Sequence, residues 1–329
     1  MKISYDAHLV NFESLKETIL GEGKTPLIES RSISQQFGFS SLYLKNEMVN
    51  PTGSFKDRES AYVFSRLLSP WTSKKIAIAS SGNAAISACA YSAYFGKTCL
   101  CYVSDKIPQG KIDLITLLGG QIKKIPGSYE DVYEYLIDNL PENAINITSG
   151  QLDSRENGNI PIVEEIYASG IKPEAIIIPV GNGSLLYGIF KGLQKLMMNG
   201  IIKSYPQLIG VEMLGYAPVA EAIRQGKAWV AIAESPDSIA DAGIAAQKAY
   251  CSAEAIFALK ETKGFMVEIH EEDLQGALKA ILKEGLVAEP SSACVVAALK
   301  YLPDFKEKTL VAILSGSGFK MIPFILNQI

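Results

Sequence analysis

Residues 175–185 read AIIIPVGNGSL, and this stretch decides the expected fold because it joins a strand to a helix through a glycine-rich turn. A run of apolar residues is typical of a strand that is buried on both faces of a parallel sheet. The same order of β-branched run, turn and helical pattern recurs from about residue 74 onward. This alternation predicts an α/β fold with mostly parallel sheets covered by helices.

The expected elements are spread over most of the chain. Seven segments fit strands, at residues 75–79, 98–103, 121–125, 175–179, 207–212, 264–269 and 309–314. Six segments have helical periodicity, at residues 58–68, 84–95, 129–140, 185–198, 271–284 and 291–302. We expect two domains, a smaller α/β domain over residues 45–147 and a larger one formed by residues 1–44 plus 148–329. The passage at residues 145–158, rich in Asn, Ser, Gly and Asp, is expected to border the cleft between them.

The composition points to a small-molecule partner. The 329 residues carry a net charge of −4, from 31 basic and 35 acidic side chains, with no long run of either sign. Such a balance disfavours nucleic acid and anionic membranes as partners. The first residues carry charges throughout, and no stretch reaches the roughly 18 apolar residues of a membrane span. We therefore expect a cytoplasmic protein.

The cysteines and histidines exclude several kinds of site. Five cysteines are scattered without a C-x-x-C pair, which predicts reduced, buried thiols. With only His8 and His270 present, a histidine-based zinc site or a Ser-His-Asp relay has too few side chains. We expect no metal, and a catalytic base other than histidine.

Three glycine-rich turns follow expected strands, at residues 80–83, 181–185 and 315–318. Turns of this kind bind ligands in parallel-sheet proteins, because a helix start presents free N–H groups there. The turn at 181–185 suits a phosphate, since glycine lets the backbone approach an anion closely. Leu186 stands where a dinucleotide fingerprint needs its third glycine, so NAD is disfavoured. A single stretch of this kind is commonly just a tight turn with capping residues. Three such stretches in one chain disfavour that explanation.

Residues 50–58 read NPTGSFKDR and place Lys56 where a turn becomes a helix. A helix start and partial burial both lower the pKa of a lysine, which leaves more of the neutral amine that an aldehyde requires. A lone lysine would more commonly be solvated on the first helical turn. The surrounding motif favours the reactive lysine.

These motifs resemble those of the fold-type II pyridoxal 5′-phosphate (PLP) enzymes, the tryptophan synthase β-like family, and within it the threonine synthases. Residues 50–58 match the lysine motif, and residues 79–83, ASSGN, match the next signature. Residues 23–27, 179–184 and 314–320 resemble the opening segment, the phosphate loop and the closing segment. The motifs follow the family order from about residue 20 to residue 320. The resemblance implies a PLP cofactor in the cleft between two domains, and a homodimer.

The resemblance also implies roles for individual residues. Lys56 would form the Schiff base with the cofactor, and Asn83 would contact its ring hydroxyl. The phosphate would be held by Gly181, Asn182, Gly183, Ser184 and Leu185. Ser315 would face the pyridine nitrogen, where a neutral hydroxyl favours elimination and replacement over transamination. The substrate carboxylate would be bound by Ser80, Ser81 and Gly82.

The implied reaction is that of threonine synthase, a carbon–oxygen lyase acting on a phosphate. O-phosphohomoserine would lose phosphate by γ-elimination, and water would add at Cβ to give L-threonine, with Lys56 moving the protons. Arg155 and Asn146 lie in the segment that surrounds the substrate phosphate in the family. Arginine suits that role because its donors bind phosphate bidentately.

Two departures from the family pattern leave other reactions open. After Arg155 the chain reads Asn157-Gly158-Asn159-Ile160-Pro161 where the family commonly shows Glu-Gly-x-Lys-Thr, and Ser317 replaces a frequent histidine. A paralogue could perform β-replacement or elimination on O-phosphoserine or O-acetylserine, as a cysteate or diaminopropionate synthase would. A serine or threonine dehydratase is another alternative. From a different class, the chain could be a catalytically inactive PLP-fold binding protein, although intact Lys56, Asn83 and Ser315 argue against this.

Overall fold

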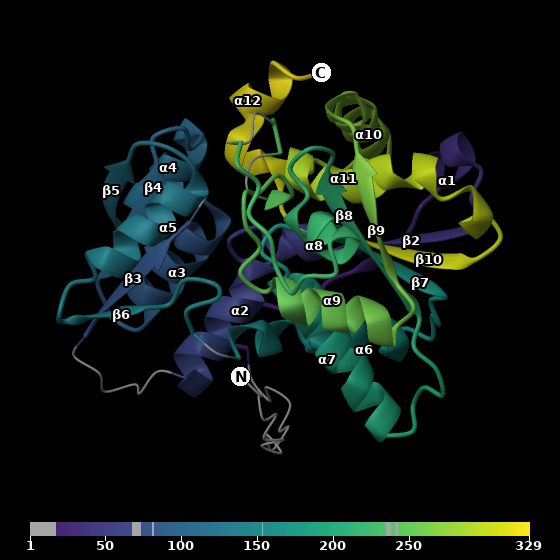
Figure 1. The fold of residues 1–329 in the computed structure, drawn as a ribbon, viewed down its shortest axis with the longest axis horizontal. Coiled ribbons are helices and arrows are strands. Elements are labelled where there is room, and N and C mark those ends of the chain that lie inside the picture. Colours follow the sequence, from purple (N-terminus) through teal and green to yellow (C-terminus); the bar gives the residue numbers. More distant parts are fainter. Residues whose placement is uncertain (1–17, 68–73, 81, 153, 235–237, 241–242) are drawn as a thin grey trace.

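The computed structural model describes residues 18–67, 74–80, 82–152, 154–234, 238–240 and 243–329. The elements form two groups that lie beside each other, each built around its own sheet (Figure 1). Both sheets are mostly parallel and covered by helices. The expected α/β class is therefore confirmed.

The larger sheet has six strands. They are β1 (Leu27–Glu29), β2 (Ser41–Asn46), β7 (Ala175–Pro179), β8 (Gln207–Met213), β9 (Phe265–Ile269) and β10 (Thr309–Leu314). Their order across the sheet is β1-β2-β10-β7-β8-β9, and every pair is parallel except β1 with β2. The last strand, β10, thus lies between β2 and β7, near the middle of the sheet.

Helices cover both faces of the larger sheet. One face packs against α1 (Ser32–Phe37), α10 (Glu271–Lys283) and α11 (Pro290–Ala297), and the other against α6 (Pro161–Ala168), α7 (Ser184–Met198), α8 (Pro218–Arg224) and α9 (Ser252–Glu261). Strand β10 alternates between the two cores: Leu310 faces the first and Val311 the second. Both side chains are fully buried. Such double burial explains the apolar runs of the sequence.

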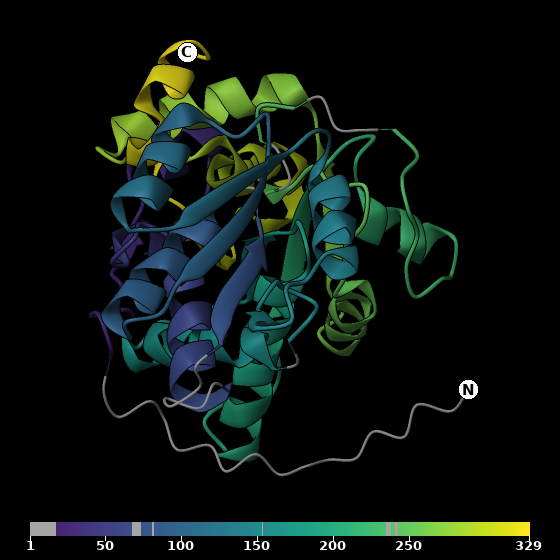
Figure 2. The ribbon, with the colours of Figure 1, turned by 90° about the vertical axis from the view of Figure 1, so that its left-hand side faces the viewer.

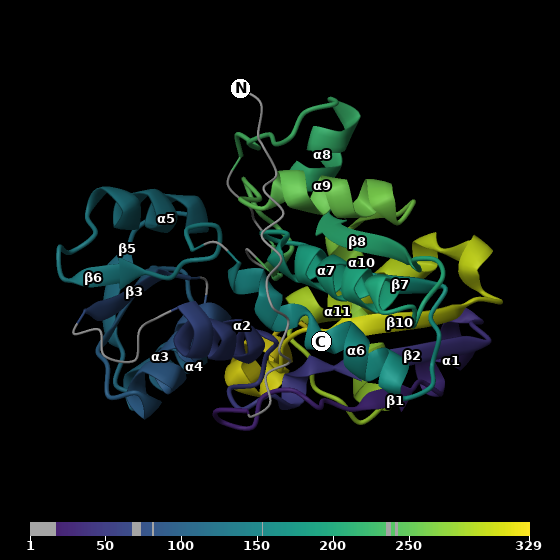
Figure 3. The same cartoon turned by 90° about the horizontal axis from the view of Figure 1, so that it is seen from below.

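The smaller sheet has four parallel strands in the order β5-β4-β3-β6. They are β3 (Lys75–Ala79), β4 (Cys99–Ser104), β5 (Gln121–Ile125) and β6 (Ala144–Asn146). Its helices are α3 (Asn83–Tyr94) and α4 (Gln109–Leu117) against one face and α5 (Tyr129–Asp138) against the other. Figure 2 looks onto this group, and Figure 3 shows it beside the larger one from below.

Shorter helices complete the fold. Helix α2 (Lys56–Tyr62) continues into a π-helical turn at Val63–Leu67, and its end packs with the core of the smaller sheet. The 3-10 helices include η1 (Glu47–Val49), η3 (Arg155–Asn159), η5 (Ala298–Tyr301), η6 (Pro303–Phe305) and η7 (Gly318–Met321), and the last α-helix is α12 (Ile322–Leu326). Helix η3 contacts both α2 and α7. It therefore lies where the two groups meet.

All seven expected strands are present, and four of them, β3, β5, β7 and β10, have the expected bounds. Strands β1, β2 and β6 escaped the sequence reasoning. The expected helix at 58–68 begins two residues earlier and changes to π geometry at Val63. The domain limits at 44/45 and 147/148 stay predictions; the first falls within β2. In the part of the chain that is described, no helix has the length and apolarity needed to cross a membrane.

Candidate functional site

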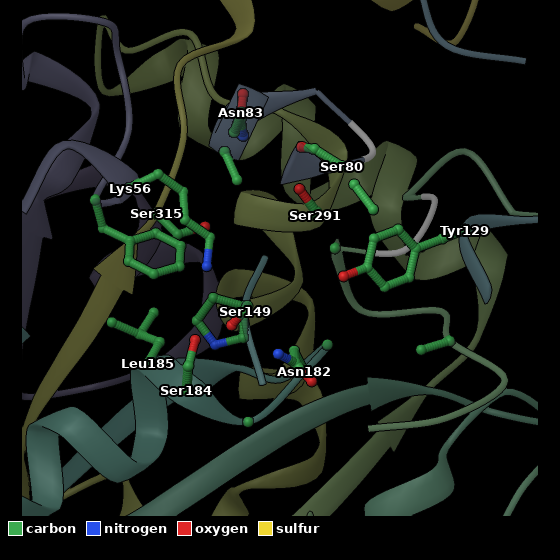
Figure 4. Close-up of a pocket in the computed structure, with 18 of the residues that line it drawn as sticks. Lys56, Ser80, Asn83, Tyr129, Ser149, Asn182, Ser184, Leu185, Ser291 and Ser315 are labelled. Carbon is green, nitrogen blue, oxygen red and sulfur yellow. The ribbon is translucent and has the colours of Figure 1, made fainter. Parts of the chain in front are cut away.

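A pocket lies between the two sheets, and both contribute to its lining (Figure 4). Ser80 follows β3 and Ser149 follows β6 in the smaller sheet, while Gly181 follows β7 and Ser315 follows β10 in the larger one. The carboxyl ends of both parallel sheets therefore meet at the pocket. This edge is where open α/β sheets bind their ligands.

The loop before Lys56 is held against the segment after β10. Phe55 donates its backbone N–H to the carbonyl oxygen of Ser315 over 3.0 Å, and Ser317 donates its own to Gly53 over 2.8 Å. The Lys320 amine also donates to the carbonyl oxygen of Gly53, over 2.8 Å. Gly53 has a φ of +81°, which favours glycine. These bonds bring the lysine motif and the closing segment of the sequence together.

Asp57 and Arg58 fix the first turn of α2 from inside the protein. Asp57 accepts hydrogen bonds from the backbone N–H and the hydroxyl of Thr52, over 2.7 and 2.6 Å. Arg58 is buried and forms ion pairs with Glu47 and Glu165, over 2.6 and 2.7 Å. Buried neighbours on both sides leave Lys56 with a defined position, and its side chain is only 15% exposed. A solvated lysine would not have these surroundings.

The Lys56 amine lies 2.9 Å from the carboxylate of Glu59, which is fully buried. Burial lowers the pKa of Lys56, Glu59 opposes that shift, and the nearby Arg155 guanidinium adds to it. Burial alone would raise the pKa of Glu59, but Lys56 and Arg155 outweigh it and lower that pKa to about 2. Glu59 was missed from the sequence. Its spacing of three residues after Lys56, on one helix face, was the available signal.

The turn after β7 is shaped to receive an anion. Gly183 has a φ of +92°, and a Cβ there would lie 2.7 Å from the carbonyl oxygen of Cys251. The Asn182 side-chain oxygen accepts from the backbone N–H of Tyr250 over 2.6 Å. Its amide nitrogen is buried and has no partner among the described residues. An unpaired buried donor at the start of α7 suits a phosphate oxygen.

Asn83 begins α3 on the opposite side of the pocket. Its side-chain nitrogen donates to Glu289 over 2.6 Å, and its side-chain oxygen is buried without a partner in the described chain. Glu289 also lies 3.3 Å from the Lys111 amine and 3.5 Å from that of Lys320. Asn83 therefore keeps a polar atom for a ligand while its orientation is fixed by a buried carboxylate.

The structure brings most of the predicted site residues to one pocket. Its lining includes Lys56, Ser80, Asn83, Gly181, Asn182, Gly183, Ser184, Leu185 and Ser315. Gly82, Asn146 and Arg155 are not part of that lining, and Ser81 lies outside the described residues. The Asn146 side chain accepts from the backbone N–H of Thr148 over 2.9 Å.

Arg155 is almost fully buried and largely occupied by protein groups. Its Nε donates to Glu59 over 2.9 Å, and its Nη1 donates to the carbonyl oxygen of Ile147. Only Nη2 has no partner within the described ranges. One donor of the arginine is thus buried and unpaired among the described residues, while its charge is compensated by Glu59.

Several lining residues were not anticipated, among them Tyr129, Ser149, Lys248 and Ser291. Tyr129 and Ser291 lie at the starts of helices that the sequence predicts at 129–140 and 291–302, but their place in the pocket was not predicted. Lys248 lies in a segment without regular structure. Its amine is 4.7 Å from the ring centre of Trp229. No sequence pattern would have pointed to it.

Three thiols gather in the core of the smaller group, apart from the pocket. The sulfur atom of Cys101 lies 3.2 Å from that of Cys89 and 3.7 Å from that of Cys99. All three are buried, and none of the cysteines forms a disulfide. Because three sulfur atoms this close could ligate an ion, the expected absence of a metal stays a prediction.

Comparisons with known proteins agree with this geometry. Residues 18–316 match the model of the family described as "Pyridoxal-phosphate dependent enzyme". The chain is 30% identical to a threonine synthase of Methanocaldococcus jannaschii, over 92% of this chain and 76% of that protein. It is also 30% identical to a threonine synthase of a Bacillus species, over 96% and 88%. A fungal L-serine ammonia-lyase from Rhizomucor miehei shares the fold, with a TM-score of 0.80 at 17% identity over 92% and 96% of the two chains.

The pocket fits the cofactor of that family. The unpaired Asn182 amide and the start of α7 suit its phosphate, and Lys56 suits its aldehyde. Asn83 and Ser315 lie on the same lining. The cofactor of this protein is pyridoxal 5′-phosphate. The chain belongs to the family of pyridoxal-phosphate dependent enzymes.

Proposed function

We propose that this enzyme is a threonine synthase, which eliminates phosphate from O-phosphohomoserine and adds water at Cβ to give L-threonine. The observation that carries this proposal is the 30% identity with threonine synthases over more than nine-tenths of the chain. The pocket supports it, because Lys56 and the neutral Ser315 face a single space. When bound, PLP supplies an electron sink for the negative charge that develops at the substrate Cα.

Lys56 is the proposed proton carrier. With PLP bound and the substrate amine joined to it, the Lys56 amine would take one proton from Cα and one from Cβ as phosphate leaves, and would return one to Cγ and one to Cα. Water would supply the hydroxyl group at Cβ, and its remaining proton would go to the released phosphate. The surroundings of Lys56 support this role, since burial favours the neutral amine and Glu59 stabilises the ammonium. Among the described residues that line the pocket, no histidine offers an alternative base.

The substrate carboxylate is assigned to the turn before α3. Ser80 accepts hydrogen bonds at its hydroxyl oxygen from the backbone N–H groups of Gly82 and Ala85, over 2.9 and 3.1 Å. Those two bonds leave the hydroxyl proton free to donate to a carboxylate. The start of α3 adds its favourable dipole. We therefore keep Ser80, Ser81 and Gly82 as the proposed carboxylate site.

The substrate phosphate has two candidate cations. Arg155 offers its Nη2 donor, and Asn146 belongs to the same proposed region. Lys248 lines the pocket and forms no ion pair with a described carboxylate. Its amine contacts the aromatic rings of Trp229 and Tyr250, at 4.7 and 5.0 Å from their centres. A cation held only by rings keeps its hydrogen-bond donors for an anion.

One observation favours a second candidate, a serine or threonine dehydratase. The charge of Arg155 is compensated by the buried Glu59, so less positive charge remains for a phosphate than a free arginine would supply. A substrate whose leaving group is a hydroxyl needs no such charge. The homodimer and the cytoplasmic location remain predictions from the sequence.

The test is a comparison of four substrates with the purified, PLP-loaded enzyme: O-phosphohomoserine, O-phosphoserine, threonine and serine. Phosphate, 2-keto acid and new amino acids are measured in each reaction. Equal amounts of phosphate and threonine from O-phosphohomoserine would support the threonine synthase. Keto acid from threonine or serine, without any turnover of O-phosphohomoserine, would contradict this function and support the serine or threonine dehydratase.

A further inference from the structure

Glu59 joins groups from three separate elements. Its Oε2 accepts from the amine of Lys56 and from Nε of Arg155, both over 2.9 Å. Its Oε1 accepts from the side chains of Asn159 and Ser184, both over 3.0 Å. No surface of Glu59 is exposed. The carboxylate is thus fixed by four donors, from α2, η3 and α7.

We propose that Glu59 is a positioning residue, which holds the Lys56 amine by an ion pair and, opposed by Arg155, sets how readily that amine takes and gives up a proton. This inference rests on the proposed role of Lys56, but not on the identity of the substrate. It concerns a property of the lysine that exists before any substrate binds.

The argument begins with the cost of buried charge. A carboxylate without water is retained only if its lone pairs and its charge are satisfied. Arg155 and Asn159 supply donors to Glu59 that do not depend on Lys56. Glu59 therefore stays negative whether or not the lysine is charged. A permanent negative charge 2.9 Å away stabilises the ammonium over the neutral amine.

Arg155 acts on the lysine in the opposite direction. Its positive charge favours the neutral amine, as burial does, while Glu59 favours the ammonium. Among the described residues, the Cys251 thiol just before α9 also acts on the lysine, and burial raises the pKa of that thiol. Tyr129 and Lys248 lie on the same pocket lining. Two fixed charges of opposite sign therefore act on the lysine, and Glu59 Oε2 is the atom that Lys56 and Arg155 share.

Ser184 gives Glu59 a second connection, to the phosphate loop. The Ser184 hydroxyl donates to Glu59 and lines the pocket beside Asn182 and Leu185. The groups assigned to the aldehyde and the phosphate of the cofactor are thus both held by one carboxylate. This arrangement keeps the two ends of the cofactor site in a fixed relation.

The test measures the proton affinity of Lys56 in the apoenzyme by competitive acetylation. Trace acetic anhydride is applied across a range of pH, and the Lys56 peptide is quantified by mass spectrometry, with exposed Lys203 as internal reference. Glu59→Gln removes the negative charge and should lower the pKa of Lys56 by one or more pH units, about a tenfold loss of proton affinity. Arg155→Met removes the positive charge and should raise the pKa of Lys56.

The two expected pKa shifts have opposite signs, which separates an electrostatic role from a structural one. A merely distorted pocket would shift the pKa of Lys56 in the same direction in both variants. In Glu59→Asp, which keeps the charge, the pKa of Lys56 should lie between its values in Glu59→Gln and in the wild type. Glu164→Gln, which removes a carboxylate paired with Lys195, is the matched control and should leave the pKa of Lys56 unchanged.

Identical titration of Lys56 in the wild type and in Glu59→Gln would overturn the proposal. If Glu59→Gln does not fold, the proposal still fails when Arg155→Met lowers the pKa of Lys56 or leaves it unchanged. No substrate or cofactor enters these measurements. A failed threonine synthase assay and a failed acetylation experiment are therefore distinguishable results.

Discussion

Phe55 donates its backbone N–H to the carbonyl oxygen of Ser315 over 3.0 Å, and this bond joins the lysine motif to the end of the central strand β10. The residue after Phe55 is the proposed cofactor lysine, and Ser315 is assigned to the pyridine nitrogen. A backbone bond is independent of either side chain, so the spacing between these two functional groups is preserved when the side chains change. The effect of a substitution at Lys56 or Ser315 can therefore be attributed to the side-chain group that is lost and not to a change in this spacing.

Lys56→Ala should abolish the visible absorbance of the lysine-bound cofactor and reduce turnover on the order of 10³-fold, since the variant loses both the attachment and the proton carrier. Absorbance spectra and initial rates check this. Lys203→Ala, at an exposed position, should behave like the wild type. An unchanged spectrum for Lys56→Ala would show that another lysine holds the cofactor.

Asn182→Asp should weaken PLP binding by at least about tenfold, because a carboxylate replaces the unpaired buried amide assigned to the phosphate. The side chain keeps its size and its bond from the Tyr250 backbone N–H. Equilibrium dialysis of the apoenzyme with PLP measures the effect. Asn199→Asp, at the exposed end of α7, is the control. Equal affinity in both variants would remove Asn182 from the phosphate site.

Lys248→Met should raise the KM for a phosphorylated substrate about tenfold or more while leaving the KM for an unphosphorylated one within about twofold. Steady-state kinetics with O-phosphohomoserine and serine compares the two. Arg155→Met serves as the parallel variant for the second candidate cation. If the KM values of both substrates rise equally in Lys248→Met, the lysine shapes the pocket instead of recognising the phosphate.

Glu165→Gln should destabilise the fold at neutral pH. Burial alone would raise the pKa of Glu165, but Arg58 and Lys45 outweigh it and lower that pKa to about 2, from 4.5 in the unfolded chain. At about 1.4 kcal/mol per pH unit, the difference is worth about 3 kcal/mol of unfolding free energy. Because the folded pKa is the lower one, this stability is present above pH 4.5 and is lost as the pH falls toward 2.

Urea denaturation at pH 7 and pH 3 measures this prediction. The unfolding free energy of the wild type should exceed that of Glu165→Gln by about 3 kcal/mol at pH 7 and by about half as much at pH 3. Glu164→Gln, which breaks a partly exposed pair with Lys195, should cost less than about 1 kcal/mol at either pH. A gap that is independent of pH would assign the loss to packing.

The sequence predicted the elements whose signal lies in their own residues. It did not predict the features that depend on contacts between segments far apart along the chain. Strands such as β7 are fully buried on both faces, so their apolar runs are unmistakable. Strand β2 escaped because it ends in two buried polar residues, Lys45 and Asn46. Lys45 pairs with the distant Glu165, whereas the Asn46 side chain accepts from the nearby backbone N–H of Met48. Strand β6 has three residues, too few for a periodic signal.

The candidate site divides in the same way. Glycine turns with a required positive φ, such as the one at Gly183, carry their geometry in the sequence. The partners of Arg155 do not, because Glu59 lies 96 residues away along the chain. Pairing of that kind follows from the packing of η3 on α2. Lys248 escaped for the same reason, since its place in the pocket lining and its contact with Trp229 come from the fold.

The central place of β10 has a consequence for how the protein is made. Strands β2 and β7 both pair with residues 309–314, so they cannot be joined until the ribosome has delivered that segment. The smaller sheet, by contrast, is complete once residue 146 has emerged. The nascent chain should therefore carry a folded smaller unit and an open larger one for nearly half of its synthesis, with the exposed edges of β2 and β7 available to chaperones during that time.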